Sequence, residues 1–208
     1  MKELKRRGCQ NIYVYDDELF GTKIPAGWMS EVADLLEPLR LNWVTQGRCS
    51  EKYVTPELMQ DARRAGCKVV FWGVESFSPK VLQAIKKHLT PDDIWHTLRV
   101  AKEAGIKNAV FTMIGNYQET VEDLAHTAEQ LEKAYNEGLI DYRQTTVATV
   151  MSGTELERIQ KAEGWYAEPP HSGRDLLDAH TGTPWLTPQQ IDSWMYQFAR
   201  ACPVGVPQ

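Results

Sequence analysis

The chain has 208 residues, of which 42% are hydrophobic and 25% are charged, a balance that is typical of one globular domain and excludes a mainly disordered state. Lys and Arg are scattered and the net charge is −5, which argues against nucleic acid as the main partner. The sequence has neither an apolar run of the roughly 20 residues that span a bilayer nor a signal peptide. We therefore expect a cytoplasmic location and no membrane partner.

Apolar runs rich in strand-forming residues alternate with amphipathic helical patterns along most of the sequence. Glycine follows several of the helical patterns, and the pairs Ser78-Pro79 and Thr90-Pro91 are typical helix starts. In chain order, we expect a strand over 11–17, a helix over 25–39, a strand over 41–48, a helix over 55–66, a strand over 67–76, helices within 78–105, a strand over 107–115, a helix over 120–138, a strand over 141–150 and a helix over 154–164.

Strands separated by helices pair in parallel through right-handed crossovers, so these five βα units predict an α/β fold with a parallel sheet. The pattern leaves a (β/α) barrel and a doubly wound sheet open. After residue 165 the character changes, because 167–175 is rich in turn formers and 188–202 has the pattern of a final helix. We expect one domain over 1–165 and a helical tail over 166–208 that packs on it.

Polar side chains follow the first three predicted strands, at the carboxyl ends where parallel α/β folds bind ligands. These side chains belong to Asp16 and Asp17, to Gln46 and Arg48, and to Glu75 and Ser76. Two carboxylates at one edge would suit an ammonium group. Simpler interpretations stay open, because the aspartates fit a turn, Arg48 fits a surface ion pair, and serines beside Glu75 fit a helix cap.

The fourth predicted strand runs into a glycine turn at Gly115 and then into the acidic start of a helix. Capping alone would explain the carboxylates there. The five histidines never fall at HxxxH or HExxH spacing, and the four cysteines have no CxxC spacing. We predict no metal site within this chain.

Several motifs occur in a fixed order: VYDDELF at 14–20, Gln46 and Arg48, GVESFSPKVLQAIKK at 73–87, AKEAGIKNAVFTMIGNYQET at 101–120 and VMSGTELE at 150–157. They resemble the radical S-adenosylmethionine (SAM) superfamily, in the branch whose members often carry a cobalamin-binding domain. The family patterns are Phe-x-Asp-Asp-x-x-Phe, then GIESGS followed by VLxxIxK, then a GLPGET-like turn. The sequence departs from them with Asn116, Tyr117 and Gln118 in place of Leu-Pro-Gly. The resemblance covers residues 1–165.

The resemblance implies a partial TIM-like (β/α) barrel that lacks its first βα unit. That unit, and the CxxxCxxC loop that holds the family's [4Fe–4S] cluster, would lie before Met1, so we expect a fragment or a truncated form of an enzyme. The complete enzyme would cleave SAM reductively at the cluster to a 5′-deoxyadenosyl radical, for hydrogen abstraction from substrate or for methyl transfer. Cobalamin, where used, would belong to a domain outside this chain.

The resemblance also implies a SAM site on this chain. Asp16 and Asp17 resemble the segment that binds the methionyl ammonium, whereas Arg48 and Glu75 resemble contacts to methionyl or ribose groups. The adenine would be bordered by Ile114, Gly115 and Val147. The complete predicted set is Asp16, Asp17, Gln46, Arg48, Glu75, Ser76, Ile114, Gly115 and Val147.

Two other hypotheses compete with a fragment of a radical SAM enzyme. One is a cluster-free, non-catalytic protein that binds SAM or a nucleoside or acts as a scaffold, and the other is an unrelated α/β scaffold. A barrel without its first strand would leave the strand at 11–17 with an unpaired edge. We therefore expect dimerisation, or another cover, at that edge. The sequence does not indicate the substrate.

Overall fold

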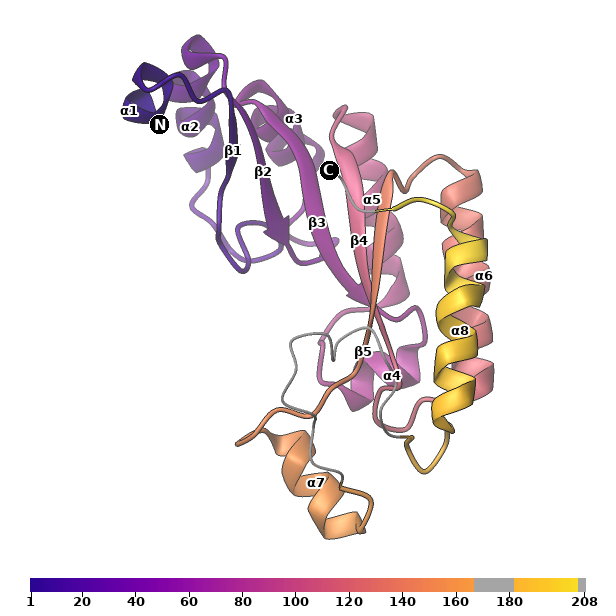
Figure 1. Ribbon diagram of the computed structural model, residues 1–208. Coiled ribbons are helices and arrows are strands. Elements are labelled where there is room, and N and C mark those ends of the chain that lie inside the picture. The colour runs from indigo at the N-terminus through magenta and orange to yellow at the C-terminus, as the bar shows by residue number, and fades with distance from the viewer. Residues whose placement is uncertain (167–181, 206–208) are drawn as a thin grey trace.

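The computed structural model describes residues 1–166 and 182–205. One sheet holds five parallel strands in the order β1-β2-β3-β4-β5 (Figure 1). The strands are β1 (Asn11–Tyr13), β2 (Asn42–Gly47), β3 (Cys67–Glu75), β4 (Lys107–Ile114) and β5 (Tyr142–Val147). Because sheet order follows chain order, the βα units wind in one direction, whereas a doubly wound sheet reverses at a switch point. The fold is a partial (β/α) barrel, and the doubly wound alternative is wrong.

The helices lie on one face of this sheet and at its ends (Figure 1). They are α1 (Lys2–Arg6), α2 (Trp28–Leu36) with the short 3₁₀ turn η1 (Glu37–Leu39), α3 (Pro56–Arg64), α4 (Pro79–Ala84), α5 (Pro91–Glu103), α6 (Val121–Asn136), α7 (Glu155–Glu163) and α8 (Pro188–Ala201). The two predicted starts within 78–105 are confirmed as separate helices. Ser78 caps α4, and Thr90 forms a capping box with Asp93 at α5.

The main core lies between the sheet and the helices and is rich in aromatic side chains. Trp72 is fully buried in its centre, and its indole N–H donates to Asn108 Oδ1 at 2.8 Å. The amide of Asn108 donates in turn to the carbonyls of Leu98 and Leu139, both at 2.8 Å. A buried polar group needs such partners, so this network ties β3 and β4 to the helical layer in one register.

The other face of the sheet is more open and carries a row of aromatic rings. Tyr13, Phe71 and Phe111 come from β1, β3 and β4, with ring centroids 6.1 Å apart between the first two and 5.3 Å between the last two. Tyr13 is 46% exposed. In a barrel this face is the interior, so β1 to β5 present an inner wall that is open along one side.

Strand β1 is shorter than predicted, because the chain leaves the sheet at Tyr15. The N–H of Asp16 donates to the Val14 carbonyl at 3.1 Å, and the N–H of Glu18 donates to Asp16 Oδ1 at 3.0 Å. Two consecutive tight turns end the strand there. Asp16 and Asp17 therefore lie on a loop beyond β1.

The C-terminal helix α8 packs against α6 and contacts β4 and β5 (Figure 1). Ile191 and Phe198 of α8 are buried, and the guanidinium of Arg143 on β5 donates to the Cys202 carbonyl at 3.1 Å. The predicted turn-rich segment 167–175 lies outside the described residues. Within the part that is described, none of the helices is long and apolar enough to cross a membrane.

Candidate functional site

The carboxyl ends of β1, β2 and β3 bring one group of polar side chains to the same edge of the sheet. Arg48 follows β2, and its Nη1 lies 3.7 Å from Glu18 Oε1 on the loop after β1. The backbone N–H of Arg48 donates to the Phe20 carbonyl at 2.9 Å, which fixes that loop beside β2. Arg48 therefore shares one surface with the loop that carries Asp16 and Asp17.

The structure contains both contacts that the simpler interpretations predicted, a turn at Asp16 and a surface ion pair at Arg48. The side chain of Asp16 accepts a hydrogen bond within its own turn, and Arg48 forms a partly exposed ion pair with Glu18. Such a pair contributes little stability, so a ligand can replace it at small cost. Gln46 lies nearby on β2 and donates to the Tyr13 hydroxyl at 2.8 Å.

Glu75 ends β3 and forms an ion pair that reaches across the open face of the strand. Lys87 Nζ lies 2.8 Å from Glu75 Oε1, with the two side chains 27% and 20% exposed. Gly73 leaves room for this pair, because a Cβ at residue 73 would lie 2.9 Å from Lys87 Nζ. A partly buried ammonium beside a carboxylate can bind the opposite charges of an amino acid group.

Lys87 joins the candidate site through its ion pair with Glu75, although the sequence did not single it out, because a lysine pair after a helix looks like solvated surface. Its position follows from the backbone on both sides, since Lys86 has φ 55° and His88 has φ 52°. Glu75 itself has φ 61°. Left-handed backbone at residues other than glycine costs energy and clusters at functional sites.

Ser76 follows Glu75 but points to the helical side of the sheet. It is buried, its Oγ lies 3.0 Å from Thr127 Oγ1 on α6, and it accepts the N–H of Ser78 at 3.1 Å. These contacts hold the end of β3 against α6 and the start of α4. Ser76 thus lies apart from the surface shared by Arg48 and Glu75.

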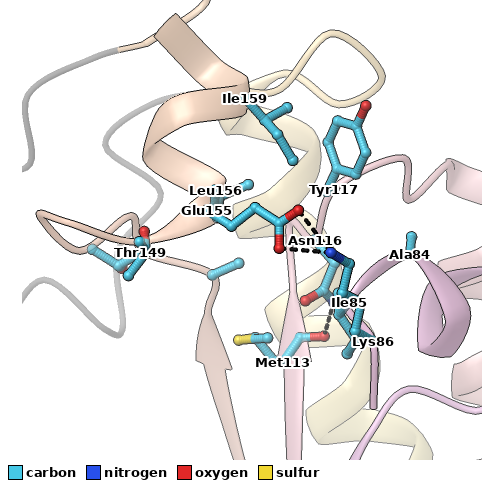
Figure 2. Close-up of a pocket in the computed structure, with 12 residues that line it drawn as sticks. Ala84, Ile85, Lys86, Met113, Asn116, Tyr117, Thr149, Glu155, Leu156 and Ile159 are labelled. Carbon is cyan, nitrogen blue, oxygen red and sulfur yellow. Dashed lines mark hydrogen bonds and ion pairs between the residues drawn. The ribbon is translucent and has the colours of Figure 1, made fainter. Parts of the chain in front are cut away.

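A cavity of about 320 Å³ lies at the ends of β4 and β5 (Figure 2). Its walls come from β4 and the loops after β4 and β5, from the loop after α4 and from α7, among them Met113, Asn116, Ala148, Leu156 and Ile159. The predicted residues Ile114, Gly115 and Val147 are direct neighbours of these lining residues in the sequence. The Ala148 N–H donates to the Ile114 carbonyl at 2.8 Å, which keeps the two strand ends together.

The glycine turn after β4 is fixed by a buried carboxylate. Glu119 Oε2 accepts the N–H groups of Gly115 at 2.7 Å and of Asn116 at 3.0 Å. Burial raises the pKa of Glu119 to about 7, although these hydrogen bonds act in the opposite direction. Gly115 has φ 79°, and a Cβ there would lie 3.2 Å from Ile191 of α8. The turn thus closes tightly beneath the cavity.

Asn116 lies at the wall of the cavity, next to Met113 (Figure 2). It is 1% exposed, and its Nδ2 donates to the Met113 carbonyl at 2.7 Å. Its Oδ1 is buried without a hydrogen-bond partner. At the mouth of the cavity, Lys86 Nζ binds both carboxylate oxygens of Glu155 at 2.7 Å (Figure 2). The cavity is therefore apolar with one unused acceptor and a charged rim.

The described residues do not fit an iron–sulfur cluster. Among residues 1–166 and 182–205, no group of three or more His, Cys, Asp or Glu side chains is placed to hold a metal ion. Cys49, Cys67 and Cys202 are buried in separate parts of the core. Burial raises the pKa of the Cys49 and Cys67 thiols to about 12 and that of Cys202 to about 11, which disfavours the thiolate that a cluster requires.

A partial (β/α) barrel with charged side chains and an apolar cavity at the carboxyl ends of its strands has the architecture of the TIM type, in which ligand sites lie at that edge. Residues 1–131 match the sequence profile described as the Radical SAM superfamily, so the chain belongs to this superfamily. The resemblance deduced from the ordered motifs is confirmed.

Three known proteins illustrate this relationship. An uncharacterised methyltransferase of Pyrococcus horikoshii is 31% identical over 120 residues, which are 58% of this chain and 25% of the relative. The radical SAM methyltransferase TsrM of Kitasatospora setae, solved with cobalamin and a [4Fe–4S] cluster bound, superposes with a TM-score of 0.59 at 18% identity, over 73% of this chain and 28% of TsrM. Coproporphyrinogen III oxidase (HemN) of Escherichia coli superposes with a TM-score of 0.60 at 15% identity, over 91% of this chain and 40% of HemN.

The chain spans about a quarter of the length of its curated relative and of TsrM. The two structural likenesses support the barrel fold, and the family follows from the sequence profile.

Proposed function

We propose that the carboxyl edge of this sheet binds SAM, as the SAM-binding part of a radical SAM enzyme. The observation that carries the proposal is the arrangement at that edge. A charged group at the ends of β1 to β3 lies on the same edge as an apolar cavity at the ends of β4 and β5. SAM has the same two halves, a zwitterionic methionyl group and a flat nucleoside.

In this proposal the methionyl group lies over the ends of β1, β2 and β3. Asp16, Asp17 and Glu75 supply carboxylates for its ammonium, and Arg48 and Lys87 supply positive charge for its carboxylate. Gln46 would add a hydrogen bond. Ser76 would act by positioning Glu75, because its own hydroxyl is already bonded to Thr127 and Ser78.

The nucleoside would occupy the cavity after β4 and β5. Its volume of about 320 Å³ lies at the small end of the range for small-molecule sites. The adenine would pack against lining residues whose sequence neighbours are Ile114, Gly115 and Val147. These three residues would support the wall from behind. The apolar lining suits a purine, and the polar rim suits ribose hydroxyl groups.

Within the family, a [4Fe–4S] cluster supplies the reductive cleavage of SAM to a 5′-deoxyadenosyl radical. Because the described residues do not fit a cluster, the proposal assigns the cluster, and any cobalamin, to segments other than those described. A second function is favoured by the same observation. It is a cluster-free protein that binds SAM or a nucleoside without catalysis.

Isothermal titration calorimetry of the full chain with SAM and with 5′-methylthioadenosine tests the proposal. We expect both compounds to bind. In a triple variant with alanine at Asp17, Arg48 and Glu75, the affinity for SAM should fall more than the affinity for 5′-methylthioadenosine. Absence of binding by both compounds would overturn the proposal. Iron–sulfur reconstitution and reduction of this chain joined to a segment that carries the family's CxxxCxxC loop separates the two functions: formation of 5′-deoxyadenosine supports the enzyme, and binding without product supports the cluster-free function.

We also propose that a second copy of this chain pairs with the open edge of β1. Tyr13 on this strand and Leu35 on the neighbouring helix α2 are both exposed. An apolar groove of about 280 Å³ lies between α2, Met1, Val14 just after β1 and Trp43 of β2. The cytoplasmic location and the absence of a nucleic-acid partner stay predictions.

A further inference from the structure

The buried Oδ1 of Asn116 is an acceptor that the fold leaves unused. Buried polar atoms in native proteins are almost always hydrogen-bonded, and each exception requires an explanation. Here the exception lies in the wall of the apolar cavity beside the strand ends, on a residue that is 1% exposed. A ligand that brings a donor to this point would complete the hydrogen bonding.

The orientation of the Asn116 amide is fixed by its surroundings. Nδ2 donates to the Met113 carbonyl at 2.7 Å and lies 3.3 Å from each carboxylate oxygen of Glu119. The reverse orientation would place Oδ1 against a carbonyl and a carboxylate, which are both acceptors. The oxygen is therefore the atom that stays free.

The cavity around Asn116 offers apolar side chains against which a flat ring can pack. Met113 comes from β4, Ala148 follows β5, and Leu156 and Ile159 come from α7. These four side chains are apolar, so a bound ring would be held by packing and oriented by the unpaired oxygen of Asn116. A ring with an amino group at its edge satisfies the acceptor, whereas a ring with a carbonyl at the same place repels it.

We propose that Asn116 selects the base in this cavity: its Oδ1 accepts a hydrogen bond from the exocyclic amine of a 6-aminopurine and rejects a 6-oxopurine. This inference rests on the proposed function and deepens it by naming the residue that sets base specificity. Asn116 is also one of the positions at which the chain departs from its family's pattern, which has a leucine there. A leucine has no acceptor, so the selection belongs to this chain's own sequence.

The test measures the affinity of three nucleosides by isothermal titration calorimetry with the full chain. They are 5′-methylthioadenosine, its analogue without the 6-amino group, and 5′-methylthioinosine. None of them carries a methionyl group, so the measurement does not depend on a cluster. We expect loss of the amine to weaken binding roughly tenfold and the inosine to bind more weakly still, because the buried acceptor is left unpaired or opposed.

Two variants assign this preference to Asn116. In Asn116→Ala and Asn116→Leu we expect the affinities for the first two nucleosides to become equal. Tyr117→Phe is the matched control. Tyr117 also lines the cavity, but its hydroxyl donates to the exposed Glu163, so this variant should keep the preference. Circular dichroism melting of each variant checks that it is folded.

Each outcome has one meaning. Equal affinities for the first two nucleosides in the wild-type chain would overturn the inference without needing any variant to fold. A preference that persists in folded Asn116→Ala would overturn it too. In both cases the nucleosides still bind and the proposed function stands. Failure of all three nucleosides to bind would overturn this inference, and the proposed function falls with it only if SAM also fails to bind.

Discussion

Glu119 is a buried carboxylate, and its protonation makes the stability of the turn after β4 depend on pH. Its pKa is about 7 in the folded chain against an ordinary 4.5, so folding favours the protonated form. The stability that this preference contributes is fully present below pH 4.5 and is lost as the pH rises through about 7. The turn therefore becomes less stable toward neutral pH.

Glu119→Gln removes this titration while keeping an oxygen that accepts the Gly115 and Asn116 N–H groups. Between about pH 4 and about pH 8, we expect the free energy of unfolding of the wild type to fall relative to the variant by on the order of 3 kcal/mol. Urea unfolding at several pH values measures the difference. Glu129→Gln, at an exposed position of α6, is the control and should keep the wild-type pH dependence. A pH dependence that is the same in Glu119→Gln and in the wild type would contradict the assignment.

Lys87 is expected to distinguish SAM from its nucleoside half. Lys87→Met removes the ammonium beside Glu75 and leaves the cavity after β4 intact. Since hydrogen bonds between charged groups are stronger than neutral ones, SAM affinity should fall roughly tenfold. The affinity for 5′-methylthioadenosine should not change, and calorimetry measures both.

The matched control for Lys87 is Lys80→Met. Lys80 is paired with Asp123 on the outer side of α4 and should affect neither ligand. An equal loss of SAM affinity in the two lysine variants would show that the total positive charge of the chain, and not the position of Lys87, determines SAM affinity.

At the scale of elements, the loop between β1 and α2 is fixed by a close approach of two backbones. Gly21 has φ 94°, and a Cβ there would lie 2.1 Å from the Arg48 carbonyl oxygen. The same loop positions Phe20, which packs under Trp43 and Trp72. A side chain at residue 21 would separate this loop from the end of β2.

Gly21→Ala should therefore destabilise the chain by about 3 kcal/mol or more, because the strain of a left-handed backbone angle adds to the collision of the new Cβ with the Arg48 carbonyl. Gly27→Ala is the control and should cost about 1 kcal/mol, since Gly27 has φ 78° and a Cβ there would meet no atom within 4 Å. Chemical denaturation measures both values. Equal losses would show that the backbone angle alone, without the contact to Arg48, determines the cost.

At the scale of the whole molecule, the proposed pairing of two copies of the chain depends on the open edge of β1. Gln10 and Val14 exchange backbone hydrogen bonds with β2, so the alternate residues Asn11 and Tyr13 direct their backbone groups away from the sheet. These unpaired groups can template pairing with a second strand.

Asn11→Pro removes one outward N–H and should convert a dimer to a monomer with only a small loss of stability. Proline is tolerated at that side of an edge strand, and the hydrogen bond lost from Asn42 Nδ2 to Asn11 Oδ1 is exposed. Light scattering after size-exclusion chromatography measures the mass. Ile12→Pro is the matched control: its N–H faces β2, so it should destabilise the chain. A monomeric wild-type chain would count against pairing through this edge.

The sequence alone predicted the elements and the family, because these depend on local patterns. The alternation of runs gave five strands in chain order, Thr90 and Pro91 marked the start of α5, and the motif around Glu75 indicated the superfamily. The turn at Gly115 was also predictable, since a glycine before a capped helix is a local signal. Strand ends were less predictable, because the turns that end β1 at Tyr13 depend on hydrogen bonds of Asp16.

Only the tertiary structure decided which side chains meet. The pair of Lys87 with Glu75 and the different orientation of Ser76 depend on how loops fold back over the sheet, whereas the partial barrel itself was already implied by the family resemblance. The unpaired oxygen of Asn116 is visible only after every neighbour has been placed. Local propensity determines elements over a few residues, whereas a site depends on contacts between residues far apart in the chain, and packing alone sets these.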